Sequence, residues 1–222
     1  MKNVYSLTGE PLNELAKLDN HTWSILGDSI STLDAYVNKQ YWDFMQERHD
    51  NLTAYVYGQH GYRISDILEH YSAAHVSDIM TVFGGINDFG GNVPLGTIAD
   101  NTSSTFFGAM NLLCNGMLTT FSESLIIFIT PLGNNNSPYI SYNETNNIGL
   151  TIYNYASAMK DVCAKAKIPI VDACSESLLN PYNANARLEY FVDGLHLNVK
   201  GHEVLSYLVE AEMLKHYIPQ LT

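Results

Sequence analysis

The stretch Trp23-Ser24-Ile25-Leu26-Gly27-Asp28-Ser29 sets the pattern of the fold. Its mostly apolar first part predicts a buried strand, and Gly27-Asp28-Ser29 then predicts a tight turn that carries polar side chains. Similar runs predict further strands at residues 52–57, 78–83, 125–130 and 168–172. Between and after these runs, apolar residues at helical spacing predict helices over residues 36–49, 63–74, 105–123, 148–167 and 199–217.

Strands that alternate with helices predict an α/β fold with right-handed crossovers. We expect a three-layer α/β/α sandwich around a five-stranded, mostly parallel, flavodoxin-like sheet. The run Leu125-Ile126-Ile127-Phe128-Ile129-Thr130 is typical of a central strand that is covered on both faces. The 222 residues suit a single domain, residues 1–222, in which residues 1–21 form an N-terminal leader that packs on it.

Composition and charge exclude several classes of partner. Eleven Lys and Arg stand against 23 Asp and Glu, which gives a net charge of -12, so phosphate backbones would be repelled and nucleic acid is not expected as a partner. The longest apolar runs are far shorter than the roughly 20 residues of a membrane span. Met1–Asn20 lacks the apolar core of a signal peptide, which leaves open a cytoplasmic protein or a part of a larger exported or phage protein.

The three cysteines, Cys114, Cys163 and Cys174, have neither an even count nor a C-x-x-C spacing. This pattern argues against a disulfide framework and against a zinc site. We therefore expect reduced and mostly buried thiols, and no metal.

Polar clusters follow three of the predicted strands. They are Gly27-Asp28-Ser29, Gly58-Gln59-His60-Gly61 and Gly85-Ile86-Asn87-Asp88. Because ligands bind at the carboxyl ends of the strands in open parallel sheets, we expect the three clusters to converge on one site.

These clusters, with Asp193-Gly194-Leu195-His196 near the end of the chain, contain the groups that acyl transfer needs. Ser29 is the candidate nucleophile. On a helical turn, Asp193 would hold one ring nitrogen of His196 while the other faces Ser29. The backbone N–H groups of Ser29 and Gly61 and the side-chain amide of Asn87 are candidate oxyanion donors.

Each of these signals also has a plain structural reading. A Gly-Asp-Ser triplet occurs by chance, and Asp193 and His196 also suit a surface pair or a helix cap. Asn87 in a glycine-rich loop suits a turn, as does Gly61. Only the set as a whole favours catalysis.

Taken together and in this order, the clusters resemble the SGNH hydrolases, also called the GDSL esterase/lipase family. Gly27-Asp28-Ser29-Ile30-Ser31 matches the block of the nucleophile, and Gly85-Ile86-Asn87-Asp88 is an intact G-x-N-D block. Asp193-Gly194-Leu195-His196 is the D-x-x-H block, followed by Asn198 and Gly201 as is common in the family. The chain departs from the pattern at Gln59-His60, where small or aliphatic residues are commoner, and at Leu197, where proline is frequent.

The resemblance implies a serine esterase with the catalytic residues Ser29, Asp193 and His196, and with Ser29, Gly61 and Asn87 in the oxyanion hole. It implies no organic cofactor and no metal. We expect Asp28 and Asp88 to brace the two loops through backbone hydrogen bonds. His60 is a candidate substrate contact, with a satisfied structural histidine as the alternative.

The motifs do not name the ester, because the family spans lipases, thioesterases, arylesterases and carbohydrate deacetylases. Tyrosines near the predicted strand ends and the polar segment Asn134-Asn135-Asn136-Ser137 favour a short acyl group, such as acetate on a glycan. The alternatives are a lipase, acylhydrolase or thioesterase for longer acyl chains, and a glycan-binding module with a little-used triad. A nucleotide-binding domain ranks last, because the chain lacks the phosphate-binding motifs. The oligomeric state is not predicted.

Overall fold

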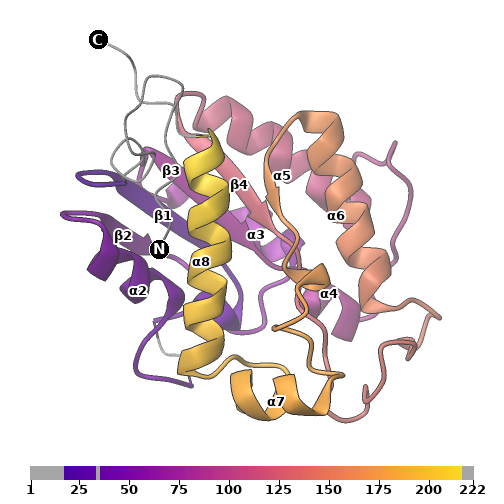
Figure 1. Ribbon diagram of the computed structural model, residues 1–222. Coiled ribbons are helices and arrows are strands. Elements are labelled where there is room, and N and C mark those ends of the chain that lie inside the picture. The colour runs from indigo at the N-terminus through magenta and orange to yellow at the C-terminus, as the bar shows by residue number, and fades with distance from the viewer. Residues whose placement is uncertain (1–17, 34–35, 217–222) are drawn as a thin grey trace, which may run out of the picture.

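The computed structural model describes residues 18–33 and 36–216 (Figure 1). Their strands form one sheet in which every pairing is parallel, in the order β2-β1-β3-β4-β5. The strands are β1 (Thr22–Gly27), β2 (Thr53–Val56), β3 (Ile79–Phe83), β4 (Leu125–Ile129) and β5 (Ile170–Val171). The order is the flavodoxin-like one, so the expected sheet is confirmed. Most of the expected leader, residues 1–17, lies outside the described residues.

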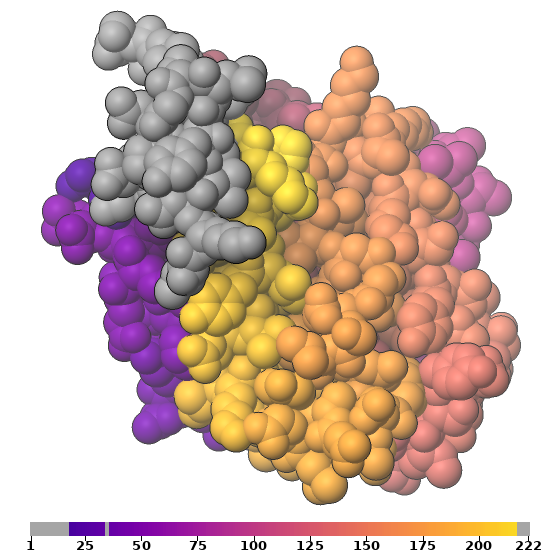
Figure 2. Space-filling model, viewed as in Figure 1, coloured from indigo at the N-terminus to yellow at the C-terminus, as the bar shows by residue number. Residues whose placement is uncertain are grey.

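Helices cover both faces of the sheet and complete the expected three layers. In Figure 1, α8 crosses in front of the strands, and in Figure 2 it forms a band on this face of the molecule. The face of α8 (Val199–His216) also holds α2 (Tyr41–Arg48), and the opposite face holds α3 (Ile64–His70), α5 (Phe106–Thr120) and α6 (Ile152–Ala166). The shorter elements are α4 (Ile86–Gly90), α7 (Ala184–Tyr190) and the 3₁₀ turns η1 (Ser29–Ser31), η2 (Tyr71–Ala73) and η3 (Ala173–Ser175).

The strand β4, which lies between β3 and β5, shows how a continuous apolar run fits into this sheet. Successive side chains of a strand point to opposite faces. Ile126 and Phe128 accordingly join the core under α5 and α6, whereas Ile127 and Ile129 join the core under α2 and α8. All four are buried, as expected for a strand between two helical layers.

Two predicted helices begin later than expected, because side-chain bonds fix their first turns. The helix predicted from Tyr36 begins at Tyr41, where the Asp43 carboxylate accepts from the backbone N–H of Gln40 at 2.7 Å. The helix predicted from Ile148 begins at Ile152, where Asn154 Oδ1 accepts from the backbone N–H of Thr151 at 2.8 Å. In each helix the cap and the third helical residue bond to each other's backbone N–H groups, a pair of bonds that often begins a helix.

The short helices α4 and α7 were not predicted. The first lies inside the glycine-rich loop that follows β3. The second is capped by Asn183, whose Oδ1 accepts from the backbone N–H groups of Asn185 and Ala186. Asn is a frequent residue at the cap of a helix, so Asn183 was the feature of the sequence from which α7 could have been predicted.

The cysteines and the helices agree with two further expectations. All three thiols are free, with Cys114 and Cys163 buried and Cys174 partly buried. Over residues 18–33 and 36–216, no helix combines the length and the apolar character of a bilayer span.

Candidate active site

The strand order gathers the polar clusters at one edge of the sheet. The chain leaves β1 toward α2 on one face of the sheet, whereas it leaves the neighbouring strands β2 and β3 toward α3 and α5 on the other face. In an open parallel sheet, such a change of direction opens a crevice at the carboxyl ends of the strands. Ser29 follows β1, Gly61 follows β2 and Asn87 follows β3. Backbone bonds join the three ends: Asp28 N–H donates to Phe83 O at 3.2 Å, and Gln59 N–H donates to Gly27 O at 3.1 Å.

Ser29, His196 and Asp193 form a continuous hydrogen-bonded chain. Ser29 Oγ lies 3.1 Å from His196 Nε2, and His196 Nδ1 lies 2.8 Å from Asp193 Oδ2. An ionised carboxylate only accepts hydrogen bonds, so Nδ1 carries the proton of a neutral ring. Nε2 is then free to accept the hydroxyl proton of Ser29, which is the arrangement that a general base requires.

The turn that holds Asp193 beside His196 is not helical, contrary to the expectation. Gly194 has φ +85°, in the left-handed region, which a right-handed helix does not contain. Instead, Asp193 Oδ1 accepts from the backbone N–H groups of Leu195 at 3.0 Å and His196 at 2.8 Å. The isolated antiparallel bridge between Phe191 and Leu197 closes the loop around them.

These bonds keep Asp193 ionised. Its partial burial would raise the pKa, but the hydrogen bonds from the His196 backbone, the His196 ring and Leu195 outweigh burial and hold the pKa of Asp193 below its ordinary value. A charged Asp193 is the group that favours a transiently protonated His196.

A neighbouring loop supports the same turn. The backbone N–H of Asn135 donates to Gly194 O at 2.9 Å. A Cβ on Gly194 would lie 2.7 Å from Asn135 O, so only glycine fits this contact. Asn135 of the polar segment 134–137 therefore lies against the turn that holds Asp193 and His196.

Ser29 sits at the start of η1 and keeps its own N–H available. Ser29 is 9% exposed. Asp28 caps the turn, because its Oδ1 accepts from Ile30 N–H at 3.0 Å. Among the described residues, no hydrogen bond acceptor faces the Ser29 N–H.

Asn87 connects the two candidate oxyanion loops. One hydrogen of its Nδ2 is donated to Tyr62 O at 2.9 Å, and a primary amide has a second hydrogen to offer. Gly85, with φ +109°, directs the chain into α4 so that Asn87 stands in its first turn. Asn87 thus holds the residue that follows Gly61.

Gly58 and Gly61 of the second cluster are required for different structural reasons. Gly61, with φ +76°, suits the third position of a type II turn, which Tyr62 N–H closes on Gln59 O at 3.3 Å. Gly58 is required by packing, because a Cβ there would lie 1.9 Å from Ser31 O. Gly58 therefore lets the loop approach the turn of Ser29–Ser31 closely.

Two buried carboxyl groups lie behind the loops. Asp28 has the bond to Ile30, and Asp88 Oδ2 accepts from Ile64 N–H at 3.0 Å. Burial, only partly offset by these hydrogen bonds, raises the pKa of Asp28 and the pKa of Asp88 to about 7 each. Both side chains bond to backbone amides, and neither has a contact with His196 among the described hydrogen bonds.

One face of the His196 ring is covered by a tyrosine. The ring of Tyr36 lies over it with a centroid distance of 4.0 Å and an interplanar angle of 33°. The ring of His60 meets Tyr36 edge to face at 6.0 Å. The sequence singled out His60 and included Tyr36 among several tyrosines, but it gave no sign that Tyr36 would cover the imidazole.

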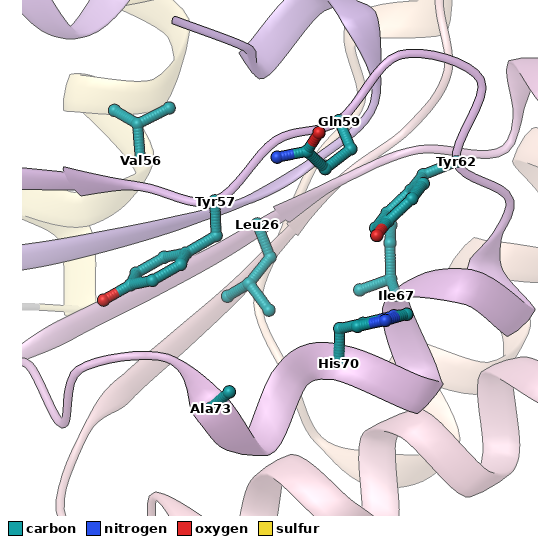
Figure 3. A pocket seen from close by; sticks show the side chains of 9 residues that line it. Leu26, Val56, Tyr57, Gln59, Tyr62, Ile67, His70 and Ala73 are labelled. Carbon is teal, nitrogen blue, oxygen red and sulfur yellow. The ribbon is translucent and has the colours of Figure 1, made fainter.

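A mainly apolar cavity of about 250 Å³ lies next to the second cluster (Figure 3). Figure 3 shows Leu26, Tyr62 and Ile67 around it, between the sheet and α3. None of Ser29, Asp193 and His196 lines the cavity, but Gly27 and Gln59, which do line it, belong to the first and second polar clusters. Tyr62 takes part in both, since its ring lines the cavity and its carbonyl is held by Asn87.

The sequence analysis named Asn135 and Asn198 without assigning a contact to either, and it gave no role to the backbone of Tyr62. Tyr62 and Asn135 act through backbone atoms, which leave no signature in a sequence. Asn198 caps α8, because its Oδ1 accepts from Gly201 N–H at 3.0 Å, and the Asn with a glycine three residues later was a readable signal. Gly201 is fixed by packing, since a Cβ would lie 2.2 Å from Tyr190 O.

Comparison with solved structures places the fold among lipases and esterases. A protein from Lactobacillus plantarum is 25% identical with a TM-score of 0.82, covering 90% of this chain and 99% of that one. A possible lipase from Chitinophaga pinensis is 22% identical with a TM-score of 0.76, covering 88% and 98%. An acetyl-xylooligosaccharide esterase from Geobacillus, crystallised as a mutant, is 17% identical with a TM-score of 0.61, covering 88% and 94%.

No curated protein sequence matches the chain. The family model of the GDSL-like lipase/acylhydrolases, in contrast, matches residues 25–204, which span all the clusters described above. The chain therefore belongs to the GDSL-like lipase/acylhydrolase family and is a carboxylic ester hydrolase.

Proposed function

We propose that the protein is a serine esterase in which Ser29 is the nucleophile, His196 is the base and Asp193 orients it. The N–H groups of Ser29 and Gly61 and the side-chain amide of Asn87 hold the oxyanion. The observation that carries the proposal is the chain of bonds from Ser29 Oγ through His196 to Asp193, with distances of 3.1 and 2.8 Å.

In the first half of the reaction, Ser29 Oγ bonds to the ester carbon while its proton passes to His196 Nε2. The electron pair of the carbonyl moves to the oxygen, where the three donors stabilise the negative charge. The bond to the alkoxy group then breaks, and the leaving oxygen takes the proton from Nε2. A water repeats these steps on the acyl-enzyme, which releases the acid and restores Ser29.

For the substrate we propose esters of short acyl groups, acetate above all, on a carbohydrate. The polar segment 134–137 lies against the triad turn, which favours a hydroxyl-rich partner over a long lipid. Tyr36, which is exposed and packs on His196, offers a flat surface with a hydrogen-bonding edge. An acetyl-xylooligosaccharide esterase shares the fold, which is compatible with this choice.

The test is hydrolysis of p-nitrophenyl esters from acetate to palmitate by the wild type and by Ser29→Ala. We expect activity on short chains and a loss of at least about 1,000-fold in kcat for Ser29→Ala. Ser31→Ala is the matched control, because Ser31 lies in the same turn but bonds to Tyr41 at 2.9 Å rather than to His196. If folded Ser29→Ala retains activity, Ser29 is not the nucleophile. If no ester is hydrolysed while glycans bind, the binding-module alternative replaces the esterase.

One observation favours a second candidate, an acylhydrolase for longer chains. The cavity of about 250 Å³ beside the Gly58–Gly61 loop is apolar enough for an acyl tail. Ala73 lines it and points toward Leu26 in Figure 3. If the acyl chain occupies the cavity, Ala73→Leu will lower activity on octanoate and leave activity on acetate unchanged. Equal effects on the two esters would count against this candidate.

A further inference from the structure

The Tyr36 ring covers one face of the proposed catalytic base and still offers a surface to solvent. Its centroid lies 4.0 Å from that of His196, with 33° between the planes. Tyr36 remains 56% exposed, whereas the side chain of His196 is only 12% exposed. The ring of Tyr36 is therefore an accessible surface beside His196.

Tyr36 also connects two walls of the site. It follows Ser29 in the same segment of the chain, and its ring meets the ring of His60 edge to face at 6.0 Å. His60 belongs to the loop of the proposed oxyanion donor Gly61. The two rings thus form an aromatic corner, Tyr36 and His60, which stands beside the base.

The positions that the carbonyl oxygen and the leaving oxygen must take show which part of the ester lies beside the aromatic corner. The carbonyl oxygen must face Ser29 N–H, Gly61 N–H and Asn87, and the leaving oxygen must come within hydrogen-bond distance of His196 Nε2. The alcohol attached to that oxygen then lies within reach of the ring that covers His196. The aromatic corner is on the alcohol side of the ester.

We propose that the aromatic corner is the alcohol subsite and that it selects an alcohol with a six-membered ring, whose face packs on Tyr36. An exposed aromatic face binds flat, weakly polar surfaces, which both a pyranose and a phenyl ring present. This inference rests on the proposed function, because it takes Ser29 and His196 as the reacting groups. It adds Tyr36 as the residue that determines specificity for the alcohol.

The experiment compares acetate esters that differ only in the alcohol. The three substrates are an acetylated methyl xyloside, phenyl acetate and the open-chain 2-methoxyethyl acetate, each measured with the wild type, Tyr36→Leu and Tyr36→Phe. Since each substrate is compared with itself across variants, its intrinsic reactivity cancels. We expect Tyr36→Leu to lower kcat/KM about tenfold more on a ring ester than on the open-chain ester, mainly through KM. Tyr36→Phe should stay within about twofold of the wild type.

The deacylation rate gives an independent readout. All three substrates form the same acetyl-enzyme, which no longer contains the alcohol. An effect of Tyr36 on the alcohol leaves this step unchanged, whereas an effect on His196 slows it for every substrate. Tyr207→Leu is the matched control, because Tyr207 is 52% exposed and packs against Arg48, away from the aromatic corner.

The outcomes separate the two proposals. A loss confined to the xyloside identifies a sugar alcohol, and a loss confined to phenyl acetate identifies an aryl alcohol. Equal losses on all three substrates, or no loss on any, overturn the alcohol subsite. If Ser29→Ala remains active, the proposed function itself fails, whatever Tyr36→Leu does.

Discussion

The side-chain amide of Asn87 donates to the carbonyl oxygen of Tyr62 at 2.9 Å, and this bond ties the loop after β3 to the loop after β2. The two proposed oxyanion donors, Asn87 and Gly61, are therefore mechanically connected. Removal of the Asn87 amide takes away one donor and also releases the turn that carries the other.

Asn87→Ala should accordingly lower kcat on p-nitrophenyl acetate by about 100- to 1,000-fold, the usual effect of a lost oxyanion donor. Asn115→Ala, at an exposed asparagine of α5, is the control and should retain wild-type activity. A folded Asn87→Ala with activity within threefold of the wild type would remove Asn87 from the oxyanion hole.

Gly194→Ala should damage both stability and activity. The left-handed φ of +85° strains any other residue by about 1 kcal/mol or more, and the Cβ would in addition lie 2.7 Å from Asn135 O, so the Asp193 turn must shift. Gly149→Ala separates the two causes, because Gly149 has φ +80° and nothing within 4 Å of its Cβ. We expect both variants to unfold at lower urea concentration and only Gly194→Ala to lose activity. Full activity of Gly194→Ala would contradict the role of this turn.

Asp28 should make stability fall as the pH rises toward neutrality. Its pKa is raised by burial from 3.8 to about 7, so the folded protein keeps a proton that the unfolded chain has already lost. This contribution is fully present below about pH 4 and is lost as the pH rises through 7. Relative to Asp28→Asn, the free energy of unfolding of the wild type should therefore decrease between pH 5 and pH 8, on the order of a few kcal/mol.

Urea denaturation at four pH values measures this difference. Asp161→Asn, which removes an exposed carboxyl of α6, is the matched control for the loss of one carboxyl group. A difference between the wild type and Asp28→Asn that does not change with pH would mean that Asp28 is ionised in the folded protein.

The strands could be predicted from the sequence because each lies in a short run that is rich in apolar residues. The observed bounds of β4 agree with the predicted bounds to within one residue, because Pro131 cannot continue a strand inside a sheet. The starts of α2 and α6 could not be read from apolar spacing, because the bonds of Asp43 and Asn154 to backbone amides decide them. The helix α7 was not predicted, because it is too short to show a periodic pattern of apolar residues.

The candidate site was predictable where side chains do the chemistry and unpredictable where the backbone does. Ser29, Asp193 and His196 were named from their residue types, and the structure brings them within hydrogen-bond distance. The contact of Asn135 with Gly194 gave no signal, because any residue has the same N–H. The packing of Tyr36 on His196 joins distant parts of the chain, which one sequence does not reveal.

The separation of 167 positions between Ser29 and His196 has a consequence for synthesis of the protein on the ribosome. Ser29, Gly61 and Asn87 leave the ribosome long before His196 does. In the proposed mechanism, a nascent or truncated chain that ends before Asp193 lacks the base that activates Ser29. Under that mechanism, ester hydrolysis starts only when the segment of His196 has folded onto the segment of Ser29, and the onset of hydrolysis reports this long-range contact.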